Sequence, residues 1–80
     1  MFFYTYVLVC GDGKLYIGST VNLRRRISEH EAGKVTATSH RLPVRLDYYE
    51  ACRSEIAARS REKQLKTGFG RRYLVNRLKP

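Results

Sequence analysis

The chain has 80 residues, so we expect one small domain over 1–80. Its hydrophobic content of 42% is ordinary for a globular chain and excludes disorder along the whole length. Sixteen Lys and Arg against seven Asp and Glu give a formal charge of +9, which predicts attraction to polyanions. Nucleic acid is favoured over an anionic membrane, although charge alone fits a passive or ribosome-associated basic protein as well.

The sequence also limits the compartment and the metal chemistry that we expect. Residues 1–3 lack a charged start, so we expect no signal peptide, and no apolar stretch approaches the ~20 residues that span a bilayer. Cys10 and Cys52 lack close Cys or His neighbours, which indicates reduced thiols and no zinc site. We therefore predict a cytoplasmic, nucleoid-associated protein with no membrane partner. Nothing in the sequence indicates an oligomeric state.

The first part of the chain predicts a hairpin and then a helix. Residues 2–10 are aromatic and β-branched, as strands prefer, and residues 14–18 form a second short strand. The glycine-rich residues between them predict the turn. Thr20 or Asn22 caps the following helix, and Gly33 ends it.

The second part predicts one more strand and two helices. After a polar loop over 34–43, apolar Val44, Leu46 and Tyr48 alternate with the residues between them, which is the period of a strand. Ser54 caps a second helix that ends near Gly68, and residues 71–78 make a short basic helix. The order β-β-α-β-α-α predicts an α+β fold, a three-stranded antiparallel sheet flanked by helices.

The length of the hairpin turn decides whether two tyrosines share a face. A three-residue loop over 11–13 places Leu8 opposite Tyr16, and Tyr6 then lies diagonally from Tyr16 at ~7–8 Å on the same face. A two-residue turn moves Tyr16 to the opposite face. Gly13 favours the longer loop, because its last position takes a left-handed residue. Ring packing, which is common for strand tyrosines, remains the alternative to a chemical role.

The first helix combines a buried stripe with two polar groups beside it. At ~100° per residue, Leu23 and Ile27 mark the stripe, Arg26 and His30 border it, and Arg25 points to solvent. An arginine turned inward requires an anion, which is either a protein carboxylate or a phosphate. A histidine at a core edge is either structural or catalytic.

The second helix places a carboxylate among apolar positions. The residues recurring at helical spacing are Ala51, Glu55, Ala58, Glu62, Leu65 and Phe69. Glu55 is explained by the helix dipole, which favours an acid in the first turn. Glu62 lies in mid-helix and requires a cation, either Arg26 or a divalent metal, since Mg²⁺ often binds through one or two carboxylates.

Together these features resemble the GIY-YIG nuclease family, the fold of the repair nuclease UvrC and of phage homing endonucleases, and particularly its small stand-alone bacterial members. The resemblance spans essentially the whole chain and rests on an ordered set of strings: Tyr4-Thr5-Tyr6, Tyr16-Ile17-Gly18-Ser19-Thr20, Asn22-Leu23, Arg25-Arg26, His30 and Arg61-Glu62-Lys63-Gln64-Leu65-Lys66. The first triplet keeps only the tyrosine of the family name, and Asn76 is the candidate for a late asparagine that some members carry.

The resemblance implies catalytic roles for Tyr6, Tyr16, Arg26, His30 and Glu62. The activity implied is endonucleolytic hydrolysis of DNA phosphodiester bonds with one Mg²⁺ or Mn²⁺, for which Glu62 is the protein ligand. Tyr16 is the first choice for activating water, with Tyr6 positioning it or sharing the role. Arg26 would neutralise the phosphate, and His30 would relay a proton or bind the phosphate.

We expect a substrate chosen by DNA structure and not by sequence, in DNA repair or processing. The alternative is a nucleic-acid-binding module of the same fold with weak or no catalysis. The residues expected to contact nucleic acid are Arg24, Arg25, Lys34, Ser39, His40, Arg41, Lys63, Lys66, Arg71 and Arg72. Thr38 lies in the same polar loop as Ser39 and His40.

Overall fold

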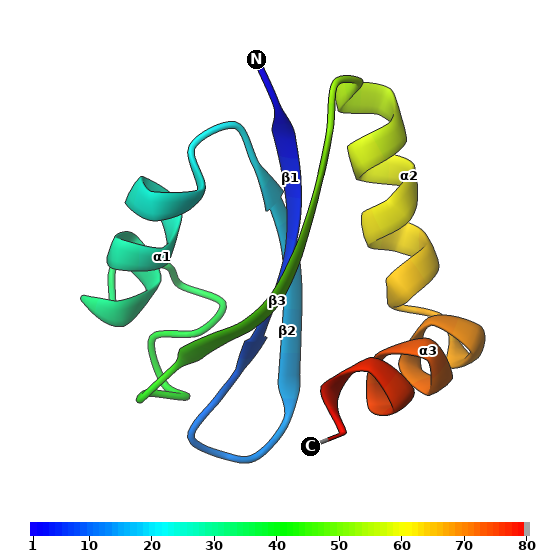
Figure 1. Ribbon diagram of the computed structural model, residues 1–80. Coiled ribbons are helices and arrows are strands. Elements are labelled where there is room, and N and C mark those ends of the chain that lie inside the picture. The colour runs from blue at the N-terminus through cyan, green and yellow to red at the C-terminus, as the bar shows by residue number, and fades with distance from the viewer. Residues whose placement is uncertain (80) are drawn as a thin grey trace.

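The computed structural model describes residues 1–79, and its centre is a three-stranded antiparallel sheet. The strands are β1 (Phe3–Val9), β2 (Leu15–Thr20) and β3 (Arg45–Cys52), in the order β2-β1-β3. β1 is therefore central, and β2 forms one edge of the sheet (Figure 1). The predicted fold class and element order are confirmed.

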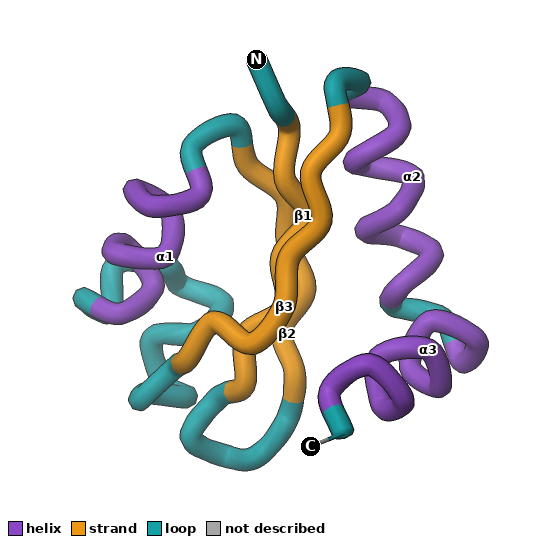
Figure 2. The backbone as a smooth tube through the Cα atoms, viewed as in Figure 1, coloured by secondary structure: helices purple, strands orange, loops and turns teal. Residues whose placement is uncertain are grey.

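Three helices cover the two faces of the sheet. α1 (Leu23–Glu31) lies against one face, and α2 (Glu55–Leu65) and α3 (Gly68–Leu78) lie against the other (Figure 2). Each helix begins at a side chain that accepts a backbone N–H: Asn22, Ser54 and Thr67. α3 starts at Gly68, three residues before the predicted start at residue 71, because the polar cap Thr67, and not the first basic residue, sets the helix start.

The hairpin has the longer of the two possible turns. Leu8 lies opposite Tyr16, and the Gly13 N–H donates to the Cys10 carbonyl at 2.9 Å. Gly13 has φ +80°, the left-handed conformation that the three-residue loop requires. Tyr6 and Tyr16 consequently share a face of the sheet, as predicted.

A β-bulge in β3 breaks the alternation that the sequence predicts. Leu8 pairs with Leu46, but Val7 pairs with Tyr48, so Asp47 has no partner on β1. The extra residue shifts the pleat by one position, and Tyr48 faces α2 while Leu46 faces α1. Tyr49 therefore turns to the α1 side of the sheet, where it meets Tyr4.

Each face of the sheet has its own apolar core. On the α1 side the buried residues are Tyr6, Leu8, Cys10 and Val44, with Leu23 and Ile27 packed against them. On the other side they are Val7, Ile17, Leu65 and Leu74. Leu23 and Ile27 thus form the predicted stripe of α1.

The inward stripe predicted for α2 is shorter than the sequence suggests. Ala58 and Leu65 are buried, but Ala51 is an exposed residue of β3 and Phe69 is 83% exposed. The helical spacing does not continue to Phe69, because α2 ends at Leu65 and α3 starts in a new direction after Thr67. Within residues 1–79, no helix has the length and apolarity that crossing a membrane requires.

Candidate active site

Two tyrosines and a histidine meet on the α1 side of the sheet. The Tyr6 and Tyr16 ring centroids lie 6.4 Å apart, and the His30 ring lies 5.6 Å from Tyr6 and 5.1 Å from Tyr16. Tyr6 is 1% exposed and His30 is fully buried, whereas Tyr16 is partly exposed. Solvent therefore reaches this cluster from the side of Tyr16.

A buried hydrogen-bonded chain runs through the cluster. The Tyr6 hydroxyl lies 2.8 Å from His30 Nε2, and His30 Nδ1 lies 2.7 Å from the Thr38 hydroxyl. Thr38 is fully buried, although the sequence places it in a polar loop. No local pattern indicates this contact, because it depends on how residues 34–43 return under α1. Thr38 is thus a site residue that the sequence analysis misses.

The imidazole of His30 is neutral in this environment. Burial, reinforced by the Arg26 charge, holds the pKa of His30 below its ordinary value. A neutral imidazole carries one N–H, so one ring nitrogen donates and the other accepts. Tyr6 and Thr38 supply hydroxyl groups, which act in either direction, and both ring nitrogens are satisfied.

Arg26 stands between the tyrosine cluster and solvent. Its side chain is 38% exposed, and its Nη1 donates to Glu29 at 3.1 Å. The sequence left a carboxylate and a phosphate open as partners, and Glu29 is such a carboxylate. Burial raises the pKa of Tyr6, while the nearby Arg26 guanidinium acts to lower it. Arg26 is therefore close to the Tyr6 phenol and is also partly exposed to solvent.

Gly18 gives the Tyr6 phenol its space. These residues are direct partners across β1 and β2, and a Cβ on Gly18 would lie 2.5 Å from the Tyr6 hydroxyl. Any side chain at position 18 would therefore displace the phenol from His30. The close approach of the Tyr6 phenol thus explains why the Tyr16-Ile17-Gly18 string ends in glycine.

Glu62 approaches the same edge of the sheet from the opposite face. Its side chain is 22% exposed and accepts from Lys66 Nζ at 2.9 Å, so its cation is Lys66 and not Arg26. Burial acts to raise the pKa of Glu62, but hydrogen bonds from Lys66 and Ser19 outweigh it, and the pKa is lowered. Ser19 lies on edge strand β2, next to Gly18, so it links Glu62 to the tyrosine side.

Of these groups, Arg26 and Ser19 line a groove at the end of β2. Its volume is about 410 Å³, and its lining residues are Ser19, Thr20, Val21, Asn22, Arg25, Arg26 and Glu29. Arg25 is 76% exposed, as its predicted solvent position requires. The groove therefore presents two guanidinium groups. It also contains Ser19, which forms a hydrogen bond with Glu62.

The donor set suits a divalent cation that prefers oxygen ligands, such as Mg²⁺ or Mn²⁺, better than one that prefers sulfur or nitrogen, such as Zn²⁺. Within residues 1–79 no three His, Cys, Asp or Glu side chains are grouped to hold an ion. Mg²⁺ and Mn²⁺ accept few protein ligands, and Mg²⁺ keeps several waters. Glu62, ionised and next to the Ser19 hydroxyl, is therefore a suitable single carboxylate ligand.

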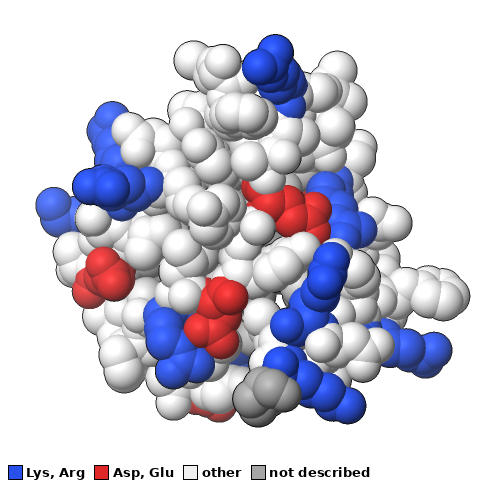
Figure 3. All heavy atoms as spheres, viewed as in Figure 1, with Lys and Arg blue, Asp and Glu red and all other residues white. Residues whose placement is uncertain are grey.

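The predicted nucleic-acid-binding residues are spread over several elements. Arg24 and Arg25 lie on α1, Lys63 and Lys66 on α2, and Arg71 and Arg72 on α3. The loop supplies Lys34, Ser39, His40 and Arg41. Figure 3 shows basic side chains scattered over one face with acidic ones between them, so that face carries no continuous positive patch.

Several of these residues have partners within the protein. Arg41 binds Asp12 at 2.9 Å and braces the hairpin turn, Lys66 is paired with Glu62, and the Ser39 hydroxyl donates to the Thr36 carbonyl at 3.2 Å. Arg41 and Arg71 also line a hollow of about 400 Å³ beside Lys14.

Comparison with known proteins gives consistent matches. The family model described as "GIY-YIG catalytic domain" matches residues 2–75. A UPF0213 protein of Streptococcus pyogenes (strain Manfredo) is 50% identical over 60 residues, 74% of this chain and 65% of the relative. A UPF0213 protein of Natronomonas pharaonis is 45% identical over 65 residues, 80% of this chain and 76% of that protein.

A solved structure agrees with the fold. The solution NMR structure of a UPF0213 protein from Bacillus halodurans has 35% sequence identity and a TM-score of 0.60, over 95% of this chain and 84% of that chain. The chain spans 65% of the length of the streptococcal relative. The names of these relatives state no activity.

Proposed function

Because the chain belongs to the GIY-YIG catalytic-domain family, we propose that it is a metal-dependent endonuclease that hydrolyses DNA phosphodiester bonds. The observation that supports this most is the convergence at the β2 edge. Tyr6, bound to His30 at 2.8 Å, approaches Arg26 on one side, and Glu62 reaches Ser19 from the other. Arg26 and Ser19 line the groove, so Tyr6 and Glu62 are each linked to it through one neighbouring residue.

The proposed roles follow from exposure and charge. Arg26 borders the groove and is the group that neutralises the phosphate as charge develops on it. Tyr16 is partly exposed and is the phenol nearest to solvent, so it is the first candidate for orienting and deprotonating water. Tyr6, whose raised pKa keeps it protonated, positions that water, and its hydrogen bond with His30 at 2.8 Å holds the phenol in place.

Glu62 is the proposed ligand of Mg²⁺ or Mn²⁺. The bound ion supplies Lewis-acid stabilisation of the phosphate and of the leaving oxygen. Lys66 must release the carboxylate for this, and an exposed i,i+4 ion pair is weak, at about 0.3–0.5 kcal/mol. Lys66 can then bind a backbone phosphate instead.

We propose that the enzyme selects DNA by its structure in repair or processing. The cationic groups of the groove are Arg25 and Arg26, and contacts of such groups with phosphate position a strand without reading its sequence. The other basic residues of the surface supply sequence-independent affinity.

Cleavage of branched and plasmid DNA with Mg²⁺ or Mn²⁺ tests the proposal, with wild type compared with Glu62→Gln. The substitution keeps the shape and removes the charge, so we expect loss of cutting while much of the DNA binding remains. Glu55→Gln is the matched control, since this exposed acid lies on the same helix and its pair with Arg59 is outside the groove. Equal cutting by wild type and Glu62→Gln would refute the role of Glu62. Intact binding with no cutting by any form would favour the non-catalytic binding module.

A further inference from the structure

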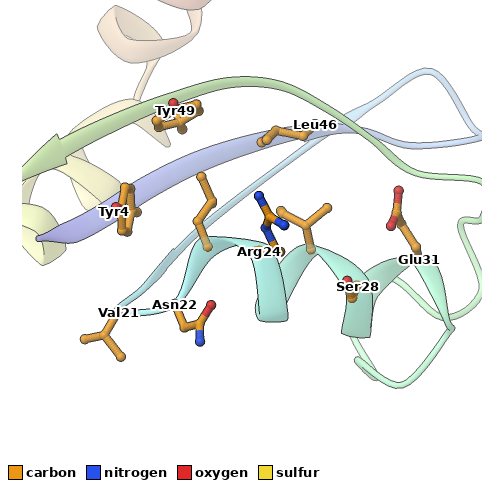
Figure 4. A pocket seen from close by; sticks show the side chains of 10 residues that line it. Tyr4, Val21, Asn22, Arg24, Ser28, Glu31, Leu46 and Tyr49 are labelled. Atoms are coloured by element: carbon orange, nitrogen blue, oxygen red, sulfur yellow. The ribbon is translucent and has the colours of Figure 1, made fainter.

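A second cleft lies outside the groove that holds Arg26. Its volume is about 550 Å³, and it separates α1 from the strands β1 and β3. Figure 4 shows Tyr4, Leu46 and Tyr49 on the sheet side and Arg24, Ser28 and Glu31 on the helix side. We propose that this cleft binds a nucleobase of the DNA strand, one that flanks the phosphate in the groove. The inference rests on the proposed function.

The sheet side of the cleft offers two aromatic rings. Tyr4 and Tyr49 pack edge to face with centroids 6.0 Å apart, and Tyr49 is 53% exposed. A half-exposed tyrosine that lines a cleft offers a face for stacking, and stacking of bases on aromatic rings tolerates any sequence. The bulge at Asp47 places Tyr49 here, because without it Tyr49 would face α2.

The charges in the cleft orient the strand. Arg24 extends from α1 toward the sheet in the middle of the cleft, between the tyrosines and Leu46, whereas Glu31 lies at the end away from the tyrosines (Figure 4). A phosphate is attracted to Arg24 and repelled from the Glu31 end, while an uncharged base is accepted between the rings and the apolar residues Leu23, Ile27 and Leu46. The base therefore occupies the cleft, and its phosphate stays beside Arg24.

The cleft and the groove meet at the connection between β2 and α1. Val21 and Asn22 line both of them, with Arg24 on the cleft side and Arg25 and Arg26 on the groove side. A strand whose phosphate lies against Arg26 passes directly over Val21 into the cleft. A flexible single strand, as in a flap or branch, makes this turn more easily than a duplex, so the cleft fits the proposed preference for DNA structure.

A binding experiment without metal tests the cleft. The probes are a short single-stranded oligonucleotide and its counterpart in which every nucleobase is replaced by an abasic unit, both in EDTA to prevent cutting. We expect wild type to prefer the base-containing strand by about tenfold, since stacking on an aromatic side chain contributes ~1–3 kcal/mol per base. In Tyr49→Ala this preference should disappear, and in Tyr49→Phe, which keeps the ring, it should remain.

Phe69→Ala is the matched control, because Phe69 is an exposed aromatic residue on α3, away from the cleft. It should keep the full preference, and circular dichroism of each variant checks the fold. A preference that survives in Tyr49→Ala, or its absence in wild type, would overturn the inference. Self-association that Tyr49→Ala abolishes, with no base preference, would assign the cleft to a second copy of the chain.

A cleavage experiment separates this inference from the proposed function. A single abasic unit is moved along the strand of a branched substrate, and cutting by wild type should fall when that unit lies beside the cut bond, but not in Tyr49→Ala. Absence of cutting on every substrate would refute the nuclease proposal and leave the binding result intact. Cutting that ignores the abasic unit at every position would refute the base-binding cleft alone.

Discussion

At the scale of single residues, His30 is held by two buried hydroxyl groups from opposite directions. Tyr6 lies at 2.8 Å from one ring nitrogen and Thr38 at 2.7 Å from the other. Among residues 1–79, no buried side-chain nitrogen or oxygen lacks a hydrogen-bond partner. Every member of the Tyr6–His30–Thr38 hydrogen-bonded series is therefore satisfied. Thr38 is therefore a positioning residue, which fixes the ring against which the Tyr6 phenol is placed.

Thr38→Val should show this positioning. Valine has the shape of threonine but leaves His30 Nδ1 buried without a partner, which costs about 1–3 kcal/mol. We expect the free energy of unfolding to fall by that amount and kcat to fall several-fold with KM little changed. Thr38→Ser keeps the hydroxyl and should retain most of kcat, and urea titrations with cleavage kinetics measure both effects. Equal kcat in the valine and serine variants would contradict the positioning role.

The same histidine should make stability depend on pH. Its pKa is lowered in the folded state by burial and by Arg26, so the unfolded chain binds the proton more readily. The free energy of unfolding is thus complete above the unfolded pKa of about 6.5 and declines as the pH falls below it, until the folded pKa is reached. Urea unfolding between about pH 7 and pH 5 measures this slope.

His30→Gln is the comparison for the pH experiment, since it removes the titrating group. The neighbouring carboxylates Glu29 and Glu62 have lowered pKa values, so they protonate below their ordinary pKa of about 4.3 and do not contribute in this window. A slope that persists unchanged in His30→Gln would show that His30 is not its source.

At the scale of elements, the contact between β1 and β2 places the Tyr6 phenol directly over Gly18. Gly18→Ala should therefore displace the Tyr6 phenol from His30. The added Cβ would lie 2.5 Å from the phenol oxygen, and Tyr6 is too tightly packed to move freely. We expect a loss of about 1–3 kcal/mol in stability and of most cleavage activity. Thermal unfolding and a cleavage assay measure the two losses.

Gly68→Ala is the control for this prediction. No atom lies within 4 Å of a Cβ at position 68, which is the first residue of α3, so the substitution should be neutral or slightly stabilising. Wild-type activity in Gly18→Ala would show that the Tyr6 position does not matter for the reaction.

The elements also show which features the sequence could predict. The register of the hairpin followed from Gly13 alone, because a local backbone requirement selects one of two loops. The bulge at Asp47 and the start of α3 after Thr67 were not predicted, since β3 has a regular alternation of residue types and the helical spacing of α2 runs on through Phe69. The bulge depends on packing between distant segments, whereas the start of α3 follows from its local cap Thr67, which the sequence analysis overlooked.

At the scale of the whole molecule, the charge of +9 strengthens the affinity for DNA, whereas one arginine, Arg26, is proposed to act in catalysis. Arg25 is 76% exposed and Arg26 is 38% exposed, although they are adjacent. Arg25→Ala should weaken DNA binding and lower the slope of log K against log salt by about one, with kcat nearly unchanged. Arg26→Ala should abolish cleavage with a smaller effect on affinity.

Fluorescence anisotropy across a salt series, together with cleavage at saturating DNA, separates the two arginines. Similar losses of kcat in both variants would mean that the groove does not distinguish them. The helical periodicity of α1 is a local pattern, and it was sufficient to predict that Arg25 is more exposed than Arg26. The sequence analysis named Arg26 or a divalent metal as the cation for Glu62 and missed Lys66, although Lys66 follows four residues later on the same helix, a spacing at which such pairs form.

The bulge at Asp47 determines where β3 can lose a residue without changing which side chains face each layer. With one unpaired residue, a single strand serves both layers, giving Leu46 and Tyr49 to the side of α1 and Tyr48 to the side of α2. Deleting Asp47 would leave Leu46 opposite Leu8 and Tyr48 opposite Val7, so the strand would become regular and the side chains beyond it would keep their faces. A deletion should therefore be tolerated better at Asp47, an exposed polar residue, than at a paired residue of β3, where it would move every later side chain to the other face.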